Sequence, residues 1–231
     1  MKPLVVIPAR GGSKGIPRKN IKPFLGRPLL CYSIDVARQV APDNRVILST
    51  DDVEIAEVGR QTGLSVPYMR PDCLATDTAS SRDVILDVMD WADDIGLDYD
   101  CVLLLQPTSP LRTVDDVRRC LDRYTSDVDM VVSVVPAMSN PYYNCFEADP
   151  ETGFLRISKG DGLYTRRQEC PPAWEMNGAV YVINPESLRK MPLGAFPRRI
   201  PVEMPSERSI DLDTPRDWVV AEAIAGMSFE G

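Results

Sequence analysis

A basic, glycine-rich segment near the start of the chain has the composition of a phosphate-binding loop. Residues 8–20 read PARGGSKGIPRKN. The glycines and the serine permit tight turns and let backbone N–H groups face a ligand. Arg10, Lys14 and Lys19 could clamp a triphosphate, because phosphates are not stripped of water without opposing charges. The glycine spacing matches neither a P-loop nor a dinucleotide-binding turn, and an ordinary strand-to-helix turn is the alternative.

The distribution of charge favours a local anion site. The first 34 residues contain seven Lys or Arg residues and no acid, within a chain whose formal net charge is -8. An acidic chain with one basic segment argues against nucleic-acid binding and for a small anionic ligand. A solvated charged segment is the alternative.

Two acidic residues near the other end of the chain could bind a metal ion. Asp211 and Asp213 are separated by one residue and precede a predicted helix. On an extended segment, residues i and i+2 point to the same side, where two carboxylates repel each other unless a cation lies between them. Mg²⁺ takes hard oxygen ligands of this kind together with substrate phosphates. An exposed loop is the alternative, and we interpret Asp51-Asp52 as the acidic first turn of a helix.

Features of the whole chain exclude several mechanisms. The sequence contains no histidine, which removes Ser-His-Asp catalysis, Cys-His catalysis and the usual zinc sites. The six cysteines include no Cys-x-x-Cys pair. No apolar run approaches the length of a membrane span or resembles a signal peptide. We therefore expect free thiols, a cytoplasmic location, and neither a membrane nor a nucleic-acid partner.

Short apolar runs that alternate with helical patterns must position these residues. The alternation predicts an α/β fold, in which a single domain over residues 1–231 has a mainly parallel sheet flanked by helices. The predicted strands are residues 4–7, 45–49, 65–68, 101–105, 130–135, 179–183 and 199–202. The predicted helices are residues 28–40, 52–62, 80–95, 113–124 and 214–224.

Residues 137–176 interrupt the alternation. This stretch contains several prolines and glycines, two adjacent tyrosines and no clean period. About 40 residues are too many for a plain loop in a compact domain. We therefore expect an inserted arm or lid.

The basic loop and several later blocks resemble the acylneuraminate cytidylyltransferases, the CMP-sialic acid synthetases. The later blocks are Arg70-Pro71, DTASS at 77–81, LQPTSPLR at 105–112, NGAVY at 177–181 and SIDLDT at 209–214. They follow the family order from residue 4 to about residue 222. The resemblance implies a Rossmann-like fold of the nucleotide-diphospho-sugar transferase type. It also implies transfer of CMP from CTP to the anomeric hydroxyl of a nine-carbon acidic sugar, with release of pyrophosphate.

The resemblance assigns roles to individual residues. Lys19, Arg10 and Lys14 are the expected catalytic cations. The expected nucleotide-binding residues are Ala9, Arg10, Gly11, Gly12, Ser13, Lys14, Lys19, Asn20, Arg70, Ala79 and Ser81. The expected sugar-binding residues are Gln106, Thr108, Ser109, Arg167 and Asn177. Arg167, with Arg166 beside it as a second candidate, would pair with the sugar carboxylate.

The resemblance also implies a cofactor and a partner. Asp211 and Asp213 would bind Mg²⁺, for which Mn²⁺ can substitute. Residues 137–176 would be a dimerisation arm that makes a homodimer and reaches the partner's active site. From the residues alone, a plain helix cap at Ser81 and a simple turn at residues 106–110 are the alternatives.

Two positions depart from the family pattern and leave the sugar open. Glu175 and Tyr143 stand where some sialic acid enzymes have basic residues. The candidates are N-acetylneuraminate, its deaminated relative KDN, legionaminate, pseudaminate and 3-deoxy-manno-octulosonate. A GTP-dependent transferase and a non-catalytic nucleotide-binding protein are further alternatives. The presence of Lys19, Asp211 and Asp213 disfavours the non-catalytic protein, since a relative without catalytic activity would be free to lose these residues.

Overall fold

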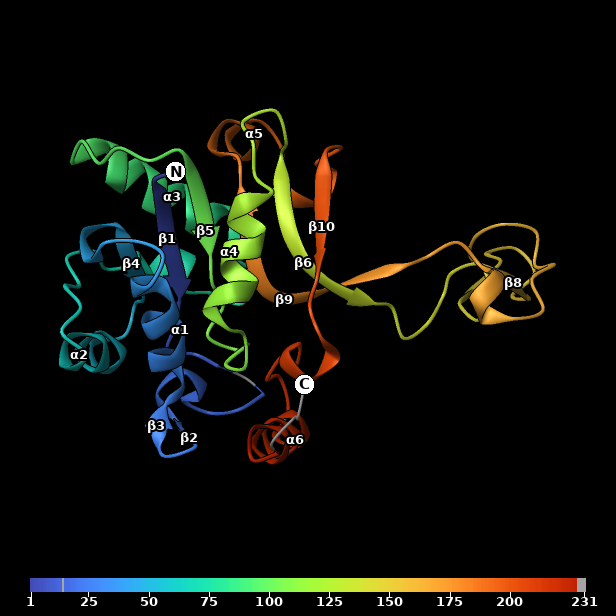
Figure 1. The fold of residues 1–231 in the computed structure, drawn as a ribbon, viewed down its shortest axis with the longest axis horizontal. Helices are drawn as coiled ribbons and strands as arrows, with labels where there is room; N and C mark the ends of the chain where they lie inside the picture. Colours follow the sequence, from blue (N-terminus) through green and yellow to red (C-terminus); the bar gives the residue numbers. More distant parts are fainter. Residues whose placement is uncertain (14, 228–231) are drawn as a thin grey trace.

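The fold is built on one six-stranded sheet (Figure 1). The computed structural model describes residues 1–13 and 15–227. The strand order is β10-β6-β9-β5-β1-β4, with β9 antiparallel to both neighbours and the other pairs parallel. The strands are β1 (Pro3–Pro8), β4 (Val46–Ser49), β5 (Cys101–Leu104), β6 (Met130–Pro136), β9 (Trp174–Ile183) and β10 (Arg199–Glu203). The predicted α/β fold with a mainly parallel sheet is confirmed.

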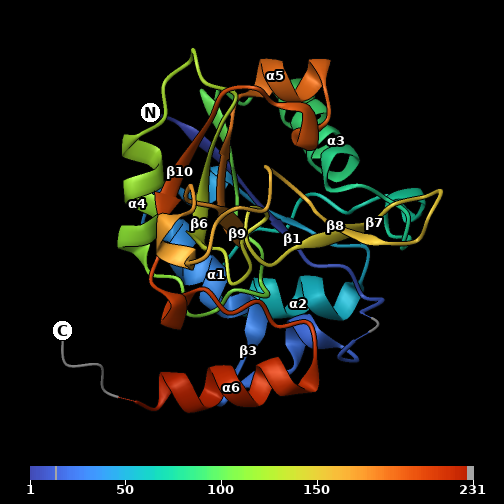
Figure 2. The same ribbon diagram turned by 90° about the vertical axis from the view of Figure 1, so that its right-hand side faces the viewer.

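Helices cover both faces of the sheet because successive strand side chains point to opposite faces. Along β1, Val5 and Ile7 pack into one buried cluster, and Leu4 and Val6 pack into the other. Figure 2 shows the two layers, with α4 on one side of the strands and α3 and α5 on the other. The first cluster takes side chains from α1 (Leu29–Arg38), α2 (Val53–Gln61) and α4 (Val114–Asp122). The second takes them from α3 (Ser81–Asp94) and α5 (Pro185–Lys190).

The smaller elements lie mostly in the connections. A small hairpin has strands of two residues each, β2 (Pro23–Phe24) and β3 (Arg27–Pro28). It packs with α6 (Pro215–Ala225) around a small third cluster of buried side chains, which includes Phe24 and Trp218. The 3-10 helices are η1 (Lys19–Ile21), η2 (Asp43–Arg45), η3 (Asp72–Leu74), η4 (Arg167–Glu169), η5 (Leu193–Ala195) and η6 (Ser206–Arg208). Among the described residues, no helix is long and apolar enough to cross a membrane.

Residues 65–68 and helix α5 are two of the places where the structure differs from the sequence-based predictions. Residues 65–68 were expected to form a strand, and this is wrong: they pair with no strand, although the side chain of Tyr68 is buried. Pro67 has no N–H to donate, which disfavours a ladder there. Helix α5 was not predicted, because its six residues are too few to show a helical period. Its start is nevertheless marked by the sequence, since Asn184 caps the helix and Pro185 is its first residue.

Residues 137–173 leave the sheet between β6 and β9 (Figure 1). Those two strands are antiparallel neighbours paired as far as Pro136 and Trp174, so the excursion connects the two strands of a hairpin. Its own structure is a small ladder of β7 (Phe146–Ala148) and β8 (Leu155–Ile157), followed by η4. Several of its apolar side chains are largely exposed: Met138, Phe146, Phe154, Leu155 and Leu163. We call residues 137–173 the arm.

Candidate active site

The loop after β1 is held in place by the end of β4 and the start of α2. The N–H of Gly11 donates to Asp51 Oδ1 at 3.0 Å. A Cβ on Gly11 would lie 2.6 Å from Asp52 Oδ2, so a larger residue does not fit without rearrangement. Asp52 itself caps α2 by accepting the N–H groups of Glu54 and Ile55. Asp51 and Asp52 were expected in the first turn of a helix, but Asp52 is the N-cap of α2, Asp51 precedes it, and Glu54 is the acidic residue of the first turn. Asp51 tethers the loop instead.

The far end of the loop packs against the segment that carries the two acidic residues. Asn20 is buried and donates to the carbonyl of Arg10 at 2.9 Å, which closes the loop on itself. Lys19 Nζ donates to the carbonyl of Leu212 at 2.6 Å and lies 3.2 Å from Asp213 Oδ1. A Cβ on Gly15 would lie 2.1 Å from the carbonyl oxygen of Asp213. The loop and residues 211–213 therefore form one wall of the site.

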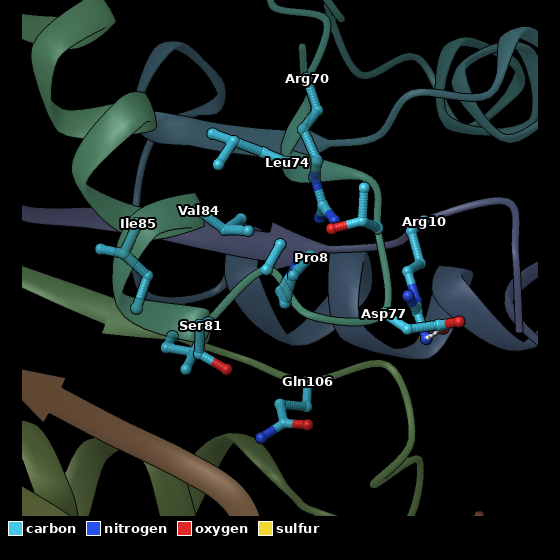
Figure 3. A pocket seen from close by; sticks show the side chains of 12 residues that line it. Pro8, Arg10, Arg70, Leu74, Asp77, Ser81, Val84, Ile85 and Gln106 are labelled. Atoms are coloured by element: carbon cyan, nitrogen blue, oxygen red, sulfur yellow. Dashed lines mark ion pairs between the residues drawn. The ribbon is translucent and has the colours of Figure 1, made fainter. Parts of the chain in front are cut away.

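A first cavity of about 270 Å³ opens at the carboxyl ends of β1 and β5. Figure 3 shows Arg10, Arg70, Ser81 and Gln106 around it, with Val84 and Ile85 on its apolar side. Ala79 also lines it. Such a mixture of an apolar wall with a few polar groups suits a base and ribose. Ser80, not Ser81, caps α3, so Ser81 is not the plain helix cap that was the alternative.

The two arginines of the first cavity are held differently. Arg70 is 6% exposed and donates to the carbonyl of Ser49 at 2.8 Å and to its hydroxyl at 3.1 Å. Burial lowers the pKa of Arg70. Arg10 forms an ion pair with Asp77 at 2.9 Å, and both side chains line the first cavity (Figure 3). An anionic ligand at Arg10 would compete with this carboxylate.

A second cavity of about 290 Å³ adjoins the first and shares Pro8, Arg10 and Gln106 with it. Its lining brings together seven of the expected site residues, from three separate segments: Arg10, Ser13, Lys19, Asn20, Gln106, Thr108 and Asp213. The two cavities thus place a nucleoside-sized space beside a space lined by cations, hydroxyls and a carboxylate. This arrangement can hold a nucleotide and a second polar substrate next to its phosphates.

A buried arginine fixes the loop that follows β5. Arg112 Nη1 donates to the carbonyl of Gln106 at 2.7 Å and to that of Ala179 at 2.9 Å. Its Nη2 donates to the hydroxyl of Ser33. Burial lowers the pKa of Arg112 to about 9. The guanidinium thereby ties the loop carrying Gln106 and Thr108 to β9 and α1.

The surroundings of Asp211 fit a divalent cation. Burial raises the pKa of Asp211, against the opposing effect of the neighbouring Thr108 hydroxyl, and the charge of Asp213 raises it further. Asp211 Oδ1, Thr108 Oγ1 and Ser109 Oγ are all buried without a hydrogen-bond partner of acceptable geometry. The described residues contain no cluster of three or more acidic or cysteine ligands. Two carboxylates suit Mg²⁺, which keeps water and phosphate oxygens as its other ligands.

Some expected site residues are not among those that line the two adjoining cavities. Lys14 is not one of the described residues. Arg167 lines a separate cavity of about 390 Å³ at the base of the arm, where its guanidinium donates to the carbonyl of Ala137. Asn177 is buried and lines neither of the two adjoining cavities. The other expected residues that are not among the lining residues are Ala9, Gly11, Gly12, Ser109 and Asp211.

Sequence reasoning did not single out several residues of the site. Asp77 belongs to the block at 77–81, but nothing in the sequence indicates that it pairs with Arg10. Arg112 ends the block at 105–112, and its burial next to two carbonyl groups depends on the tertiary structure. A charge at the end of a run of apolar and hydroxyl residues is the local signal that the sequence offers for it.

Comparisons with known proteins agree with the geometry. The family model described as cytidylyltransferase matches residues 4–224. A CMP-N,N'-diacetyllegionaminic acid synthase of Legionella pneumophila is 32% identical over 231 residues, which cover 100% of this chain and 99% of that relative. A pseudaminic acid cytidylyltransferase of Campylobacter jejuni is 30% identical over 230 residues, again with 100% and 99% covered. An N-acylneuraminate cytidylyltransferase of Streptococcus agalactiae is 33% identical over 223 residues, which cover 95% of this chain but 52% of that relative.

A solved structure shares the architecture. CMP:2-keto-3-deoxy-manno-octonic acid synthetase complexed with CTP matches with a TM-score of 0.70 at 20% identity, over 97% of this chain and 98% of that one. At this identity the likeness shows the fold alone. The family model covers nearly the whole sequence, and two relatives match it from end to end. The chain therefore belongs to the cytidylyltransferase family.

Proposed function

We propose that the protein transfers CMP from CTP to the anomeric hydroxyl of a nine-carbon acidic sugar, a nonulosonic acid of the sialic acid type. The observation that carries this proposal is the pair of adjoining cavities that share Arg10 and Gln106. One has the size and lining for a nucleoside, and the other has Lys19 and Asp213 beside hydroxyl groups. The names of the relatives support a nonulosonic acid as the acceptor.

The proposed reaction is a substitution at the α-phosphorus of CTP. The sugar oxygen forms a bond to that phosphorus, the bond to the bridging oxygen breaks, pyrophosphate leaves with the electron pair, and the hydroxyl proton passes to water. Catalysis of such a transfer consists mainly of positioning and charge stabilisation. Arg10 and Lys19 would neutralise the phosphates, and Arg70 would hold the nucleotide from its buried position.

We infer that Asp211 and Asp213 hold Mg²⁺ in this reaction. When bound, the ion would lower the pKa of the sugar hydroxyl and offset phosphate charge. The chain supplies the buried oxygen of Asp211 and the exposed carboxylate of Asp213, whose side chain is 72% exposed and faces Lys19. Mn²⁺ would substitute, because it prefers the same oxygen ligands.

The decisive experiment measures pyrophosphate release over a matrix of the four NTPs and a panel of acidic sugars with Mg²⁺. The panel contains N-acetylneuraminate, KDN, legionaminate, pseudaminate and 3-deoxy-manno-octulosonate. We expect release with CTP and at least one of the nine-carbon acids. Activity confined to GTP or to 3-deoxy-manno-octulosonate would contradict the proposed substrate pair. Absence of release from all pairs, with CTP binding intact, would favour a non-catalytic nucleotide-binding protein.

We further propose that the protein works as a homodimer in which each arm reaches the partner's active site. The arm exposes Phe154 and Leu163 by 77% and 78%, and a partner subunit could cover these apolar side chains. Arg167, the expected ligand of the sugar carboxylate, lies on this arm and outside both adjoining cavities of its own chain. A crossed arm would bring it to the partner's second cavity.

Mixing two impaired variants tests the crossed arm. At a sugar concentration well below the raised KM of Arg167→Ala, this variant and Lys19→Ala should each release little pyrophosphate alone. In a heterodimer with crossed arms, one site carries both defects and the other carries neither, so mixing should restore a measurable part of the wild-type rate of pyrophosphate release. If subunit exchange is demonstrated and the rate stays at the level of the single variants, each arm serves its own site.

A further inference from the structure

The side-chain amide of Asn177 is fully used inside the protein. Its Oδ1 accepts from the Ser133 hydroxyl at 2.6 Å and from the Ala179 N–H at 3.2 Å. Its Nδ2 donates to Ser209 Oγ at 2.8 Å and to Met204 Sδ at 3.4 Å. A primary amide has two donor hydrogens and an oxygen with two lone pairs. At 6% exposure, Asn177 has no hydrogen-bonding capacity left for a sugar hydroxyl.

Asn177 lies in an irregularity of the sheet. The register between β6 and β9 shifts between Val132 and Val134. In the gap, the Ser133 hydroxyl accepts the N–H of Val180 at 2.8 Å. Bulges of this kind re-aim side chains and are frequent beside active sites. Gly178 follows in the left-handed region with φ 75°, and a Cβ there would lie 3.2 Å from Asp211 Oδ2.

The partner of Asn177 belongs to the segment that carries the two acidic residues. Ser209 precedes Asp211 by two positions. Its neighbour Arg208 is also held by hydrogen bonds to a buried side chain. Arg208 donates from Nε and Nη2 to the two oxygens of Asp116 at 2.9 and 2.8 Å. The Asp116 side chain is 0% exposed. It also accepts the N–H of Thr113 at 2.9 Å in the capping box of α4, so its own position is fixed.

We propose that Asn177 and Asp116 are positioning residues, which hold Ser209 and Arg208 so that the carboxylates of Asp211 and Asp213 stay in place for a divalent cation. The proposal rests on the metal site of the proposed function, and it gives Asn177 a role other than contact with the sugar.

The physical need for such anchors is clear. Two carboxylates separated by one residue repel each other until a cation is bound, so the backbone that carries them must be held from outside. On the other side of the segment, the N–H of Leu212 donates to the carbonyl of Thr108 at 2.9 Å. Partners that orient metal ligands typically change metal affinity by about 10–100-fold when they are removed.

The test is Mn²⁺ binding, measured by electron paramagnetic resonance with CTP present and no sugar, so that no turnover is needed. Ser209→Ala removes one hydroxyl that the sugar-binding role does not involve. We expect it to weaken Mn²⁺ binding about tenfold and to leave the KM for sugar unchanged. Asn177→Ala should do the same, and the double variant should bind no more weakly than Asn177→Ala alone, because both changes remove the hydrogen bond between Asn177 Nδ2 and Ser209 Oγ. Ser206→Ala, at an exposed position in the preceding η6, is the matched control and should bind Mn²⁺ like the wild type.

The possible failures are distinguishable. Wild-type Mn²⁺ affinity in Ser209→Ala, together with lost affinity in Asp211→Asn, would overturn the anchoring and leave the metal site standing. An Asn177→Ala variant with a raised KM for sugar and an unchanged Mn²⁺ affinity would mean that Asn177 binds the sugar and does not position the metal ligands. Unchanged affinity in Asp211→Asn would overturn the metal site itself, and the anchoring with it.

Discussion

Asp211→Asn should lower turnover by at least about a hundredfold, which is the scale of losing one preorganised electrostatic stabiliser. The substitution keeps the shape of the side chain and removes its charge, so the fold should stay intact. Asp211 Oδ1 is buried without a partner in the described structure, and a carboxylate in that state is suited to a cation. Asp213→Asn should have an effect of the same order. The measurement is the rate of pyrophosphate release at saturating CTP and sugar over a series of Mg²⁺ concentrations.

The control for these variants is Asp122→Asn, at the exposed end of α4. It should turn over like the wild type at every Mg²⁺ concentration. Full activity of Asp211→Asn and Asp213→Asn in limiting Mg²⁺ would refute the assignment of both residues. Circular dichroism spectra identical to the wild type would establish that a loss of rate does not reflect unfolding.

Arg167→Ala should raise the KM for sugar far more than the KM for CTP. A nonulosonic acid carries a carboxylate next to the attacking hydroxyl, and a charge buried without a partner is costly. Loss of one partner from a desolvated charge pair costs about 2–5 kcal/mol, which corresponds to an increase of at least about thirtyfold in KM. Arg167→Lys should recover only part of the loss, because a point charge replaces a planar fork that holds carboxylate with two hydrogen bonds.

Arg166→Ala is the matched comparison for Arg167→Ala. Arg166 is the next residue, and its guanidinium pairs with Glu169 on the same arm. If Arg166→Ala raises the sugar KM and Arg167→Ala does not, the neighbouring arginine binds the carboxylate. If Arg167→Ala raises the CTP KM and leaves the sugar KM unchanged, Arg167 binds phosphate and the proposed location of the sugar is wrong.

The sheet was largely predictable because its strands are short apolar runs whose neighbours in sequence are amphipathic helices. The runs at 4–7 and 101–105 supply side chains to both clusters, as parallel strands covered on two faces must. Residues 65–68 have the same apolar character, yet Pro67 removes a ladder donor and the segment stays outside the sheet. Apolar composition alone does not distinguish a buried strand from a buried connection.

The site was predictable where its residues are adjacent in sequence and unpredictable where they meet across the fold. The expectation that residues 8–20 line a polar cavity depends on local composition, and Arg10, Ser13, Lys19 and Asn20 do line one. The tether of Gly11 to Asp51 spans 40 residues, and the pair of Asp116 and Arg208 spans 92. The sequence around each residue of these pairs does not indicate its partner. Only the packing of α2 and α4 against the sheet brings the partners together.

The insertion of the arm has a consequence for how this protein can diverge. Its two ends are fixed by the pairing of Pro136 with Trp174, so any connection that closes the hairpin preserves the sheet. Each doubling of a flexible connection costs only about 0.6 kcal/mol in closure entropy. The loop of residues 8–20 has no such tolerance, since Gly11 and Gly15 lie too close to Asp52 and Asp213 to accept a side chain. Changes of length in the part that we propose meets the sugar should therefore disturb the fold less than side chains added at Gly11 or Gly15.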